Sequence, residues 1–328
     1  MKLLILGGTV FLGRHLAIAA QARGHEVTLF NRGKSGPDLF PDLPQLHGDR
    51  KTEEGIAALD SAGPFDAVID TCGYVPRVVK LSAEKLKDKA ETYCFISSVS
   101  VYKNWPEEAC DETGTLATIE DPTVEEITGE TYGALKVLCE QEAEKAFPGK
   151  TLIIRPGLIV GPNDISDRFG YWPRRVAQGG EILAPGTPET PFQFIDVRDL
   201  SEWTIRLLEN GATGAYNGDG PQIPIKALLE ACGAEQVTYV SEAFLEVEKV
   251  AAWVELPVWI PGLADKPAGG ATDCTKAIAS GLTYRPLTEI VADTLAWENA
   301  TPRENAWKRT LTPEREAEVL EAWKAQQT

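Results

Sequence analysis

A tyrosine and a lysine stand four residues apart at the start of a long helical stretch. Tyr132 and Lys136 flank Gly-Ala-Leu, and residues at this spacing share one face of a helix, with about 5–6 Å between their Cβ atoms. A free phenol has a pKa of about 10, and a neighbouring ammonium favours the phenolate and so lowers that pKa. We therefore predict that Tyr132 is a general acid–base group and that Lys136 tunes it.

A serine-rich turn supplies a third candidate group. The apolar run over 92–97 leads into Ser98-Val-Ser100, and open parallel sheets bind their ligands at the carboxyl ends of the strands. A hydroxyl at such a place is able to donate to the substrate oxygen whose proton Tyr132 exchanges. We expect Ser98 to have this role, and we expect Ser97 and Ser100 to cap the turn.

A glycine-rich turn lies near the start of the chain, between the apolar run Leu3–Leu6 and a helical pattern that ends at Gly24. Such a turn lets backbone N–H groups and a helix N-terminus face a pyrophosphate. We predict a dinucleotide site here. Val10 replaces the glycine of the usual fingerprint and is expected to shift the backbone or the phosphate. The residues assigned to this turn are Gly7, Gly8, Thr9, Phe11, Leu12 and Gly13.

The residues after the second apolar run bear on which dinucleotide is preferred. A site for NAD commonly has an acidic residue here, which accepts from the ribose 2′-hydroxyl. This chain has Asn31, Arg32 and Lys34 instead, and a guanidinium pairs bidentately with a 2′-phosphate. NADP is therefore favoured over NAD. The alternative is that Arg32 caps the loop or stacks over the adenine.

Further contacts are assigned along the chain. Asp49 is a candidate partner for the adenine amine, with a turn aspartate as the alternative, and Thr71, Cys72 and Pro156 complete the cofactor contacts. Residues 163–190 are rich in glycine, proline and aromatics, which is typical of irregular structure over a site. The residues assigned to the substrate are Tyr74, Tyr102, Trp172 and Arg174.

Short apolar runs alternate with amphipathic stretches over the first 160 residues. This alternation predicts a parallel sheet with helices on both faces, because a crossover helix is needed to return the chain in parallel. We expect a Rossmann-type doubly wound α/β domain over 1–162, to which 191–217 return through a strand at 192–195. A smaller interleaved lobe for the substrate is expected over 163–190 and 218–311, and a C-terminal helix over 312–328.

Composition narrows the classes of function. The formal charge of −17 disfavours nucleic acid, because a phosphate backbone is repelled by an acidic surface. The six cysteines and three histidines lack metal-ligand spacing, so no metal is expected. The opening apolar run stops at Gly7, too short for a secretory signal, and no stretch approaches the roughly 20 apolar residues of a membrane span. We expect a cytoplasmic protein.

Taken together, these motifs resemble the short-chain dehydrogenases/reductases. The segment Arg155-Pro-Gly-Leu-Ile-Val-Gly-Pro162 and the segment Phe194-Ile-Asp-Val-Arg-Asp-Leu200 are similar to motifs of the extended branch, the NAD(P)-dependent epimerases/dehydratases. The resemblance spans about residues 1–300. It implies that Ser98 orients the substrate, that Tyr132 is the general acid–base and that Lys136 lowers its pKa.

Two departures from that branch affect the expected substrate. The pattern Gly-Gly-x-x-x-x-Gly around Val10 resembles the atypical, isoflavone-reductase-like subgroup. Phe192 and Lys266 stand where the UDP-galactose epimerase type has arginines, so a nucleotide-diphosphate pocket is in doubt. Arg168, Arg174 and Arg175 are candidates to anchor an anionic or planar substrate instead, or they are ordinary loop residues.

The resulting hypothesis is an NAD(P)-dependent reductase or an epimerase/dehydratase that acts on a sugar-like or carbonyl-bearing small molecule. Two alternatives are a non-catalytic regulator that senses NAD(P) and an RNA-binding member of the atypical subgroup. The set Ser98, Tyr132 and Lys136 argues against the regulator, and the charge of −17 argues against RNA. By analogy with the family, helices at 76–89 and 131–147 make a homodimer plausible.

Overall fold

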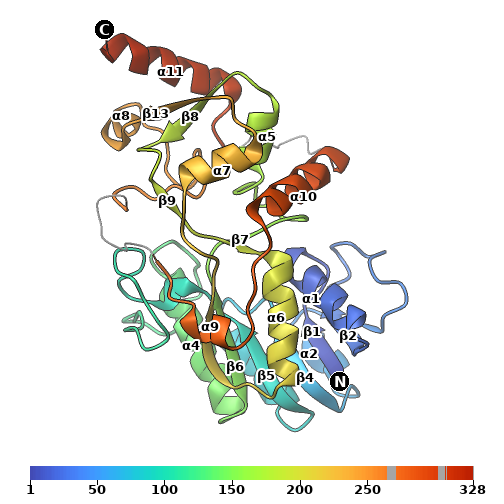
Figure 1. Cartoon of the computed structure of the whole chain (residues 1–328). Helices are drawn as coiled ribbons and strands as arrows, with labels where there is room; N and C mark the ends of the chain where they lie inside the picture. The colour runs from blue at the N-terminus through green and yellow to red at the C-terminus, as the bar shows by residue number, and fades with distance from the viewer. Residues whose placement is uncertain (264–270, 302–306, 308, 328) are drawn as a thin grey trace. The chain divides into compact units, whose positions relative to one another are not determined.

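A parallel sheet of seven strands forms the centre of the first of two compact units (Figure 1). The computed structural model describes residues 1–263, 271–301, 307 and 309–327. The strand order is β11-β6-β5-β4-β1-β2-β3, and every neighbouring pair is parallel. The strands are β1 (Lys2–Leu6), β2 (Glu26–Asn31), β3 (Gln45–His47), β4 (Phe65–Asp70), β5 (Ala90–Ile96), β6 (Thr151–Pro156) and β11 (Gly214–Gly218).

Helices cover both faces of this sheet. The chain moves from β1 to β2 in one direction and from β4 to β5 in the other, so right-handed crossovers put α1 and α3 on opposite faces. Helix α1 packs against α6, and α3 packs against α4. The helices of this unit are α1 (Phe11–Ala22), α2 (Glu53–Ile56), η1 (Ala57–Leu59), α3 (Pro76–Leu86), η2 (Val99–Val101), α4 (Tyr132–Ala146), α6 (Val197–Glu209) and α9 (Thr275–Ala279).

The residues of β1 explain its place in the interior of the sheet, between β4 and β2. Leu3, Leu4, Ile5 and Leu6 are all fully buried, as expected of a strand that is covered on both faces. The observed architecture confirms the predicted doubly wound Rossmann-type α/β fold.

The seventh strand differs from the sequence prediction. The segment expected to return to the sheet at 192–195 instead contributes β9 (Pro191–Phe192) and β10 (Ile195–Asp196), which pair with short strands of the second unit. The sheet is completed by β11, whose sequence Gly-Ala-Tyr-Asn-Gly lacks a β-branched run. A Cβ on Gly218 would lie 2.9 Å from the Leu200 side chain, so close packing against α6 accounts for the glycine.

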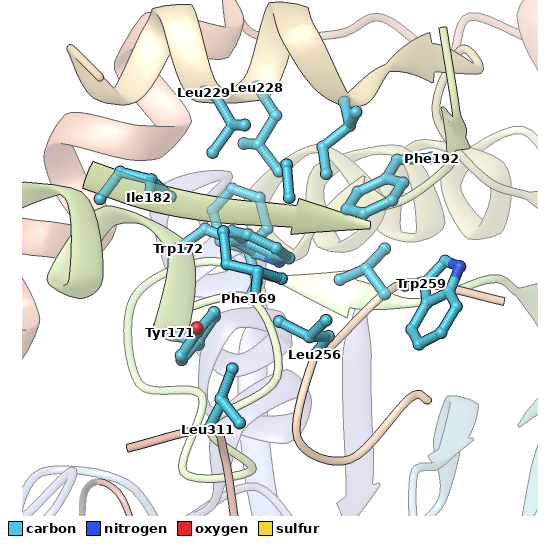
Figure 2. Packing of buried hydrophobic residues seen from close by; sticks show 14 of the residues in the cluster. Phe169, Tyr171, Trp172, Ile182, Phe192, Leu228, Leu229, Leu256, Trp259 and Leu311 are labelled. Carbon is cyan, nitrogen blue, oxygen red and sulfur yellow. The ribbon is translucent and has the colours of Figure 1, made fainter. Parts of the chain in front are cut away.

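The second unit contains an aromatic core of its own. Phe169, Trp172 and Phe192 pack together with Leu228 and Leu229 of α7 (Figure 2). Its strand pairs are β7–β10, β8–β13 and β9–β12. The remaining elements are β7 (Ile159–Val160), α5 (Tyr171–Ala177), β8 (Glu181–Pro185), β12 (Ile223–Pro224), α7 (Ile225–Cys232), β13 (Gln236–Val240), α8 (Glu242–Val247), α10 (Leu287–Ala300) and α11 (Pro313–Gln327).

The two units are interleaved along the chain. The first comprises Met1–Gly157, Val197–Asp219 and Thr272–Thr283, and the second comprises Leu158–Asp196, Gly220–Ala271 and Tyr284–Thr328. From sequence we expect the first unit to comprise 1–162 and 191–217, and we expect 272–283 to belong to the substrate lobe. Among the helices that the structure describes, none is long and apolar enough to cross a membrane.

Candidate functional site

The glycine turn after β1 is tightly folded. Gly7 and Gly8 have φ of 112° and 93°, a region that side chains rarely adopt. The Gly7 N–H donates to the Phe30 carbonyl at 2.9 Å. A Cβ on Gly13 would lie 2.5 Å from the Gly8 nitrogen, so the start of α1 is pressed against the turn. Leu12 is buried beside Gly13, and Thr9 and Phe11 are partly buried.

The amino end of α1 presents donors without a side-chain cap. Val10 occupies the N-cap position and makes no capping hydrogen bond, and the first turn of α1 contains no acidic residue. The first N–H groups of a helix have no partner within the helix and favour an anion. This donor set fits a pyrophosphate group. Val10 itself has an extended backbone and is 45% exposed, while the unusual φ of 25° falls on Phe11.

The segment after β4 supports the turn from the neighbouring strand. The Leu6 carbonyl accepts from Thr71 Oγ1 at 2.8 Å and from Cys72 Sγ at 3.4 Å. A Cβ on Gly7 would lie 2.3 Å from Thr71 Oγ1. Thr71 and Cys72, both assigned to the cofactor, therefore lie directly beside the glycine turn. Pro156 ends β6 and lies opposite Gly218 of β11.

The loop after β2 presents its cations to solvent. Asn31 Oδ1 accepts from the Gly33 N–H at 2.7 Å, and its amide donates to Gln45, which fixes the turn. Arg32 and Lys34 are exposed, and neither has an ion-pair partner among the residues that the structure describes. Asp49 is exposed, and its carboxylate accepts from the Lys51 N–H at 3.0 Å, as a turn aspartate does.

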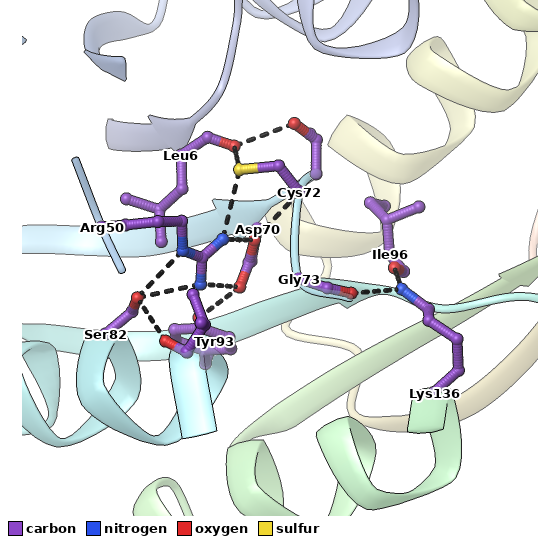
Figure 3. Close-up of polar contacts among 11 residues, drawn as sticks. Leu6, Arg50, Asp70, Cys72, Gly73, Ser82, Tyr93, Ile96 and Lys136 are labelled. Carbon is purple, nitrogen blue, oxygen red and sulfur yellow. Dashed lines mark hydrogen bonds and ion pairs between the residues drawn. The ribbon is translucent and has the colours of Figure 1, made fainter. Parts of the chain in front are cut away.

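The Lys136 ammonium is buried at the carboxyl end of the sheet. Lys136 is 2% exposed, and its Nζ donates to the Gly73 carbonyl at 2.8 Å and to the Ile96 carbonyl at 2.6 Å (Figure 3). It also lies 4.2 Å from the centre of the Phe95 ring and 5.4 Å from that of Tyr74. Burial lowers the pKa of Lys136 to about 8. The carbonyls and rings stabilise the charged form within this site.

Tyr132 is the first residue of α4 and is partly buried. The next residue fixes the start of this helix, because a Cβ on Gly133 would lie 2.0 Å from the Ser100 carbonyl oxygen. The amino end of α4 is therefore in close contact with the serine turn. The predicted groups Tyr132 and Ser98 thus belong to two segments that pack directly on each other.

The two adjacent serines differ from the sequence expectation. Ser98 caps η2, since its Oγ accepts from the Ser100 N–H at 3.1 Å and donates to Ser100 Oγ at 3.1 Å. Ser97 does not cap the turn. Its Oγ is buried and has no hydrogen-bond partner among the described residues, and it follows Ile96, whose carbonyl binds Lys136. Ser97 therefore has a buried hydroxyl without a described partner, one residue after the carbonyl that accepts from Lys136.

Tyr102, which we expected to contact the substrate, is instead part of the buried interior. It is 3% exposed, and its hydroxyl donates to Asn217 Oδ1 at 2.6 Å and accepts from Arg155 at 3.2 Å. Arg155 in turn forms a bidentate ion pair with Glu140 at 3.0 and 2.7 Å. The Tyr102 hydroxyl is thus engaged in a buried network that joins β6, α4 and β11. Tyr74, by contrast, is 46% exposed.

The expected substrate contacts of Trp172 and Arg174 are likewise wrong, because both side chains are engaged within the second unit. Trp172 is fully buried in the core of the second unit, and its Nε1 donates to the Pro257 carbonyl at 2.9 Å (Figure 2). The Arg174 guanidinium pairs with Asp167 at 2.6 Å and Glu298 at 3.1 Å. Its charge is therefore balanced within that unit. Arg175 pairs with Glu316, Phe192 is buried, and Lys266 lies outside the described residues.

A buried cluster that no sequence motif indicated lies behind the segment 70–73. Arg50 and Asp70 form an ion pair, which Tyr93 and Ser82 complete (Figure 3). Burial by itself raises the pKa of the Asp70 carboxyl, but the Arg50 guanidinium outweighs it and holds that pKa below its usual value. A lone arginine and a lone aspartate twenty residues apart form no recognisable pattern, and only the order of the strands brings them together.

Comparison with known proteins places these features in a family context. Residues 67–218 match the profile of the NAD dependent epimerase/dehydratase family. The chain is 29% identical over 248 residues to the chloroplast stem-loop binding protein of 41 kDa b from Arabidopsis thaliana, an alignment that covers 70% of this chain and 62% of that relative. This chain therefore spans less than two thirds of that protein's length.

Two further similarities concern enzymes. A 2-alkyl-3-oxoalkanoate reductase from Stenotrophomonas maltophilia (strain K279a) is 26% identical over 258 residues, which cover 72% of this chain and 77% of the reductase. The solved structure of a UDP-glucuronic acid 4-epimerase from Bacillus cereus in complex with NAD has a TM-score of 0.64 at 17% identity, with 92% of this chain and 99% of that chain covered. The structural likeness concerns the fold.

We predict that Gly133→Ala destabilises the protein although alanine is the better helix former. The gain in helix propensity is about 1 kcal/mol, whereas overpacking against the Ser100 carbonyl costs about 1–3 kcal/mol. Chemical denaturation of the variant measures the change in the free energy of unfolding. Gly129→Ala is the matched control, since a Cβ there meets nothing within 4 Å. Equal stability of the two variants would show that α4 is not fixed by this contact.

Proposed function

We propose that this chain is an enzyme of the extended branch of the short-chain dehydrogenases/reductases, and that it uses a nicotinamide dinucleotide to transform a small hydroxyl- or carbonyl-bearing molecule. The observation that carries the proposal is the buried ammonium of Lys136, held by the carbonyls of Gly73 and Ile96. A buried charge is costly unless it has a partner or a use, and this one lies on the same helix as Tyr132.

The glycine turn and its neighbours are the proposed cofactor site. The uncapped amino end of α1 takes the pyrophosphate, with Gly7, Gly8 and Gly13 giving close access. Thr71 and Cys72 line the same edge of the sheet, and Lys136 donates to the nicotinamide ribose. When bound, the nicotinamide ring supplies or accepts a hydride at its C4 position.

The proton chemistry is assigned to Tyr132. Its hydroxyl gives a proton to the substrate oxygen during reduction and takes one during oxidation. The Lys136 ammonium favours the phenolate form, because a positive charge nearby stabilises the anion. Ser98, and beside it the unpartnered hydroxyl of Ser97, are the proposed donors that orient the substrate oxygen.

The substrate class is proposed as a sugar-like or carbonyl-bearing small molecule. One relative, a 2-alkyl-3-oxoalkanoate reductase, supports a carbonyl-bearing substrate, and one structural neighbour, a UDP-glucuronic acid 4-epimerase, supports a sugar-like substrate. The assignment of a substrate lobe to 163–190 and 218–311 stays a prediction. A cytoplasmic location and a homodimer through α3 and α4 stay predictions.

A second candidate function is RNA binding, because one relative is named for binding a chloroplast stem-loop. The formal charge of −17 opposes this, since affinity for nucleic acid rests largely on cations that neutralise phosphates. A stem-loop RNA that shifts at low salt and stays bound near physiological salt would favour it over the enzyme. A regulator that only senses the dinucleotide has no need of Ser98, Tyr132 and Lys136 as a set.

Replacing Tyr132 by phenylalanine tests the catalytic assignment. We expect Tyr132→Phe to reduce turnover by about 10²–10⁴-fold, the usual contribution of a general acid–base group. The affinity for the dinucleotide is expected to stay unchanged, because the phenol exchanges a proton with the substrate. Steady-state kinetics and a dinucleotide titration measure the two effects. Tyr239→Phe, in the second unit, is the control, and wild-type turnover by Tyr132→Phe would contradict the assignment.

Reversing the charge of Arg32 tests the preference for NADP. Hydrogen bonds to charged groups contribute about 1.5–3 kcal/mol, which corresponds to more than tenfold in Kd. Arg32→Glu is therefore expected to weaken NADPH binding by more than about tenfold and NADH binding far less. Fluorescence titration gives both constants. Lys80→Glu makes the same charge change on α3, and equal losses for the two dinucleotides with Arg32→Glu would remove the argument for a 2′-phosphate contact.

A further inference from the structure

We propose that Arg50 is a positioning residue for both the dinucleotide and Lys136. It acts through Asp70 on the segment Asp70–Gly73, one end of which supports the glycine turn while the other holds the ammonium. The inference rests on the proposed function. It assigns a purpose to a buried ion pair that lies outside the motifs of the chain.

The Arg50 guanidinium forms several hydrogen bonds that together fix the position of the Asp70 side chain. Its guanidinium donates to the two carboxylate oxygens of Asp70 at 2.5 and 2.7 Å, to Ser82 Oγ at 2.9 Å and to Cys72 Sγ at 3.2 Å (Figure 3). A bidentate guanidinium–carboxylate pair fixes orientation as well as distance. Arg50 is 8% exposed and Asp70 is fully buried, so little solvent competes for these groups.

Asp70 is held by two further donors. Its carboxylate accepts from the Tyr93 hydroxyl of β5 at 2.7 Å and from the Cys72 N–H at 3.1 Å. Ser82 of α3 donates to the Val78 carbonyl at 3.0 Å, which aims its oxygen at Arg50. The last residue of β4 is thus tied to the loop after β3, to α3 and to β5.

The segment that follows serves two partners. Thr71 and Cys72 both donate to the Leu6 carbonyl, immediately before the glycine turn. The next carbonyl, that of Gly73, accepts from Lys136. The Gly73 backbone is closely packed, because a Cβ there would lie 2.5 Å from the Phe95 ring and 2.6 Å from Val79. A displacement at Asp70 is therefore transmitted to the glycine turn and to the ammonium together.

Stability alone does not explain such a pair. A buried ion pair loses its hydration and is often replaceable by apolar residues without loss of stability, so its geometry is the property that an apolar pair lacks. The two charges also act on Lys136 in opposite directions, because the Asp70 carboxylate raises the pKa of Lys136 and the Arg50 guanidinium lowers it. Removing both charges takes away one group that raises the pKa of Lys136 and one that lowers it, together with the contacts that hold Asp70 in place.

The test uses the double variant Arg50→Met/Asp70→Asn. The asparagine keeps one acceptor oxygen for the Cys72 N–H, and its amide N–H donates to the Tyr93 hydroxyl oxygen in place of the bond that this hydroxyl now donates. No unpaired charge is left buried. We expect a folded protein whose Kd for the dinucleotide is raised on the order of tenfold or more, since misplacement of positioning groups by about 1 Å has effects of this size. The pH at which affinity is lost through deprotonation of Lys136 is expected to fall below the wild-type value, because the displaced Gly73 carbonyl stabilises the ammonium less well.

The control is Arg23→Met/Glu209→Gln, which removes a bidentate pair between the end of α1 and α6. Its Kd and pH profile are expected to match those of the wild type. Melting temperatures show which variants fold. Should the double variant at Arg50 and Asp70 not fold, Arg50→Lys keeps the charge and loses the fork, and the same rise in Kd is expected of it.

The outcomes separate the two levels of the proposal. A wild-type protein that binds the dinucleotide, together with a folded variant of unchanged Kd and pH profile, overturns the positioning role alone. A wild-type protein that binds no nicotinamide dinucleotide overturns the proposed function and this inference with it.

Discussion

The Lys136 ammonium is a positive charge enclosed at the carboxyl end of the sheet, and its need for partners constrains everything around it. Taking a cation out of water is costly unless hydrogen-bond acceptors or aromatic faces compensate. Here the carbonyls of Gly73 and Ile96 and the ring of Phe95 do so. The neighbouring strands β4 and β5 therefore have to end where the carbonyls of Gly73 and Ile96 reach the ammonium, and α4 has to place Lys136 within hydrogen-bond distance of them.

Two buried ion pairs hold the end of β4 and the helix α4 in these positions. Arg50 and Asp70 fix the end of β4, while Glu140, about one turn after Lys136 on α4, is paired with Arg155 of β6. The second pair continues through Tyr102 to Asn217 of β11, whose amide donates to the Asp273 carbonyl at 3.0 Å. The three chain segments of the first unit are thus joined through polar groups that satisfy one another.

Much of this unit could be predicted from sequence. The apolar run Leu3–Leu6 and the glycines after it predict a buried strand and a turn, and the spacing of Tyr132 and Lys136 predicts their common helix. These features are local, because period, turn chemistry and helix propensity act within a few residues.

The remainder depends on packing that sequence does not reveal. Tyr102 and Trp172 have side chains suited to binding, yet they are buried because of what surrounds them in the folded units. Which of Ser97 and Ser98 caps the turn depends on the backbone angles there. Arg50 and Asp70 meet only because β4 lies beside β1 and because the loop after β3 returns towards α3.

The central claim is that this fold binds a nicotinamide dinucleotide through the glycine turn and Lys136. The most direct measurement is to purify the protein without added cofactor, identify by mass any nicotinamide released on denaturation, and titrate the empty protein with NADH and NADPH. We predict an empty protein that binds NADPH more tightly than NADH, as a reductase does. Retained NAD would point to an epimerase or dehydratase and overturn the reading of Arg32, and a protein that neither retains nor binds either dinucleotide would contradict the account.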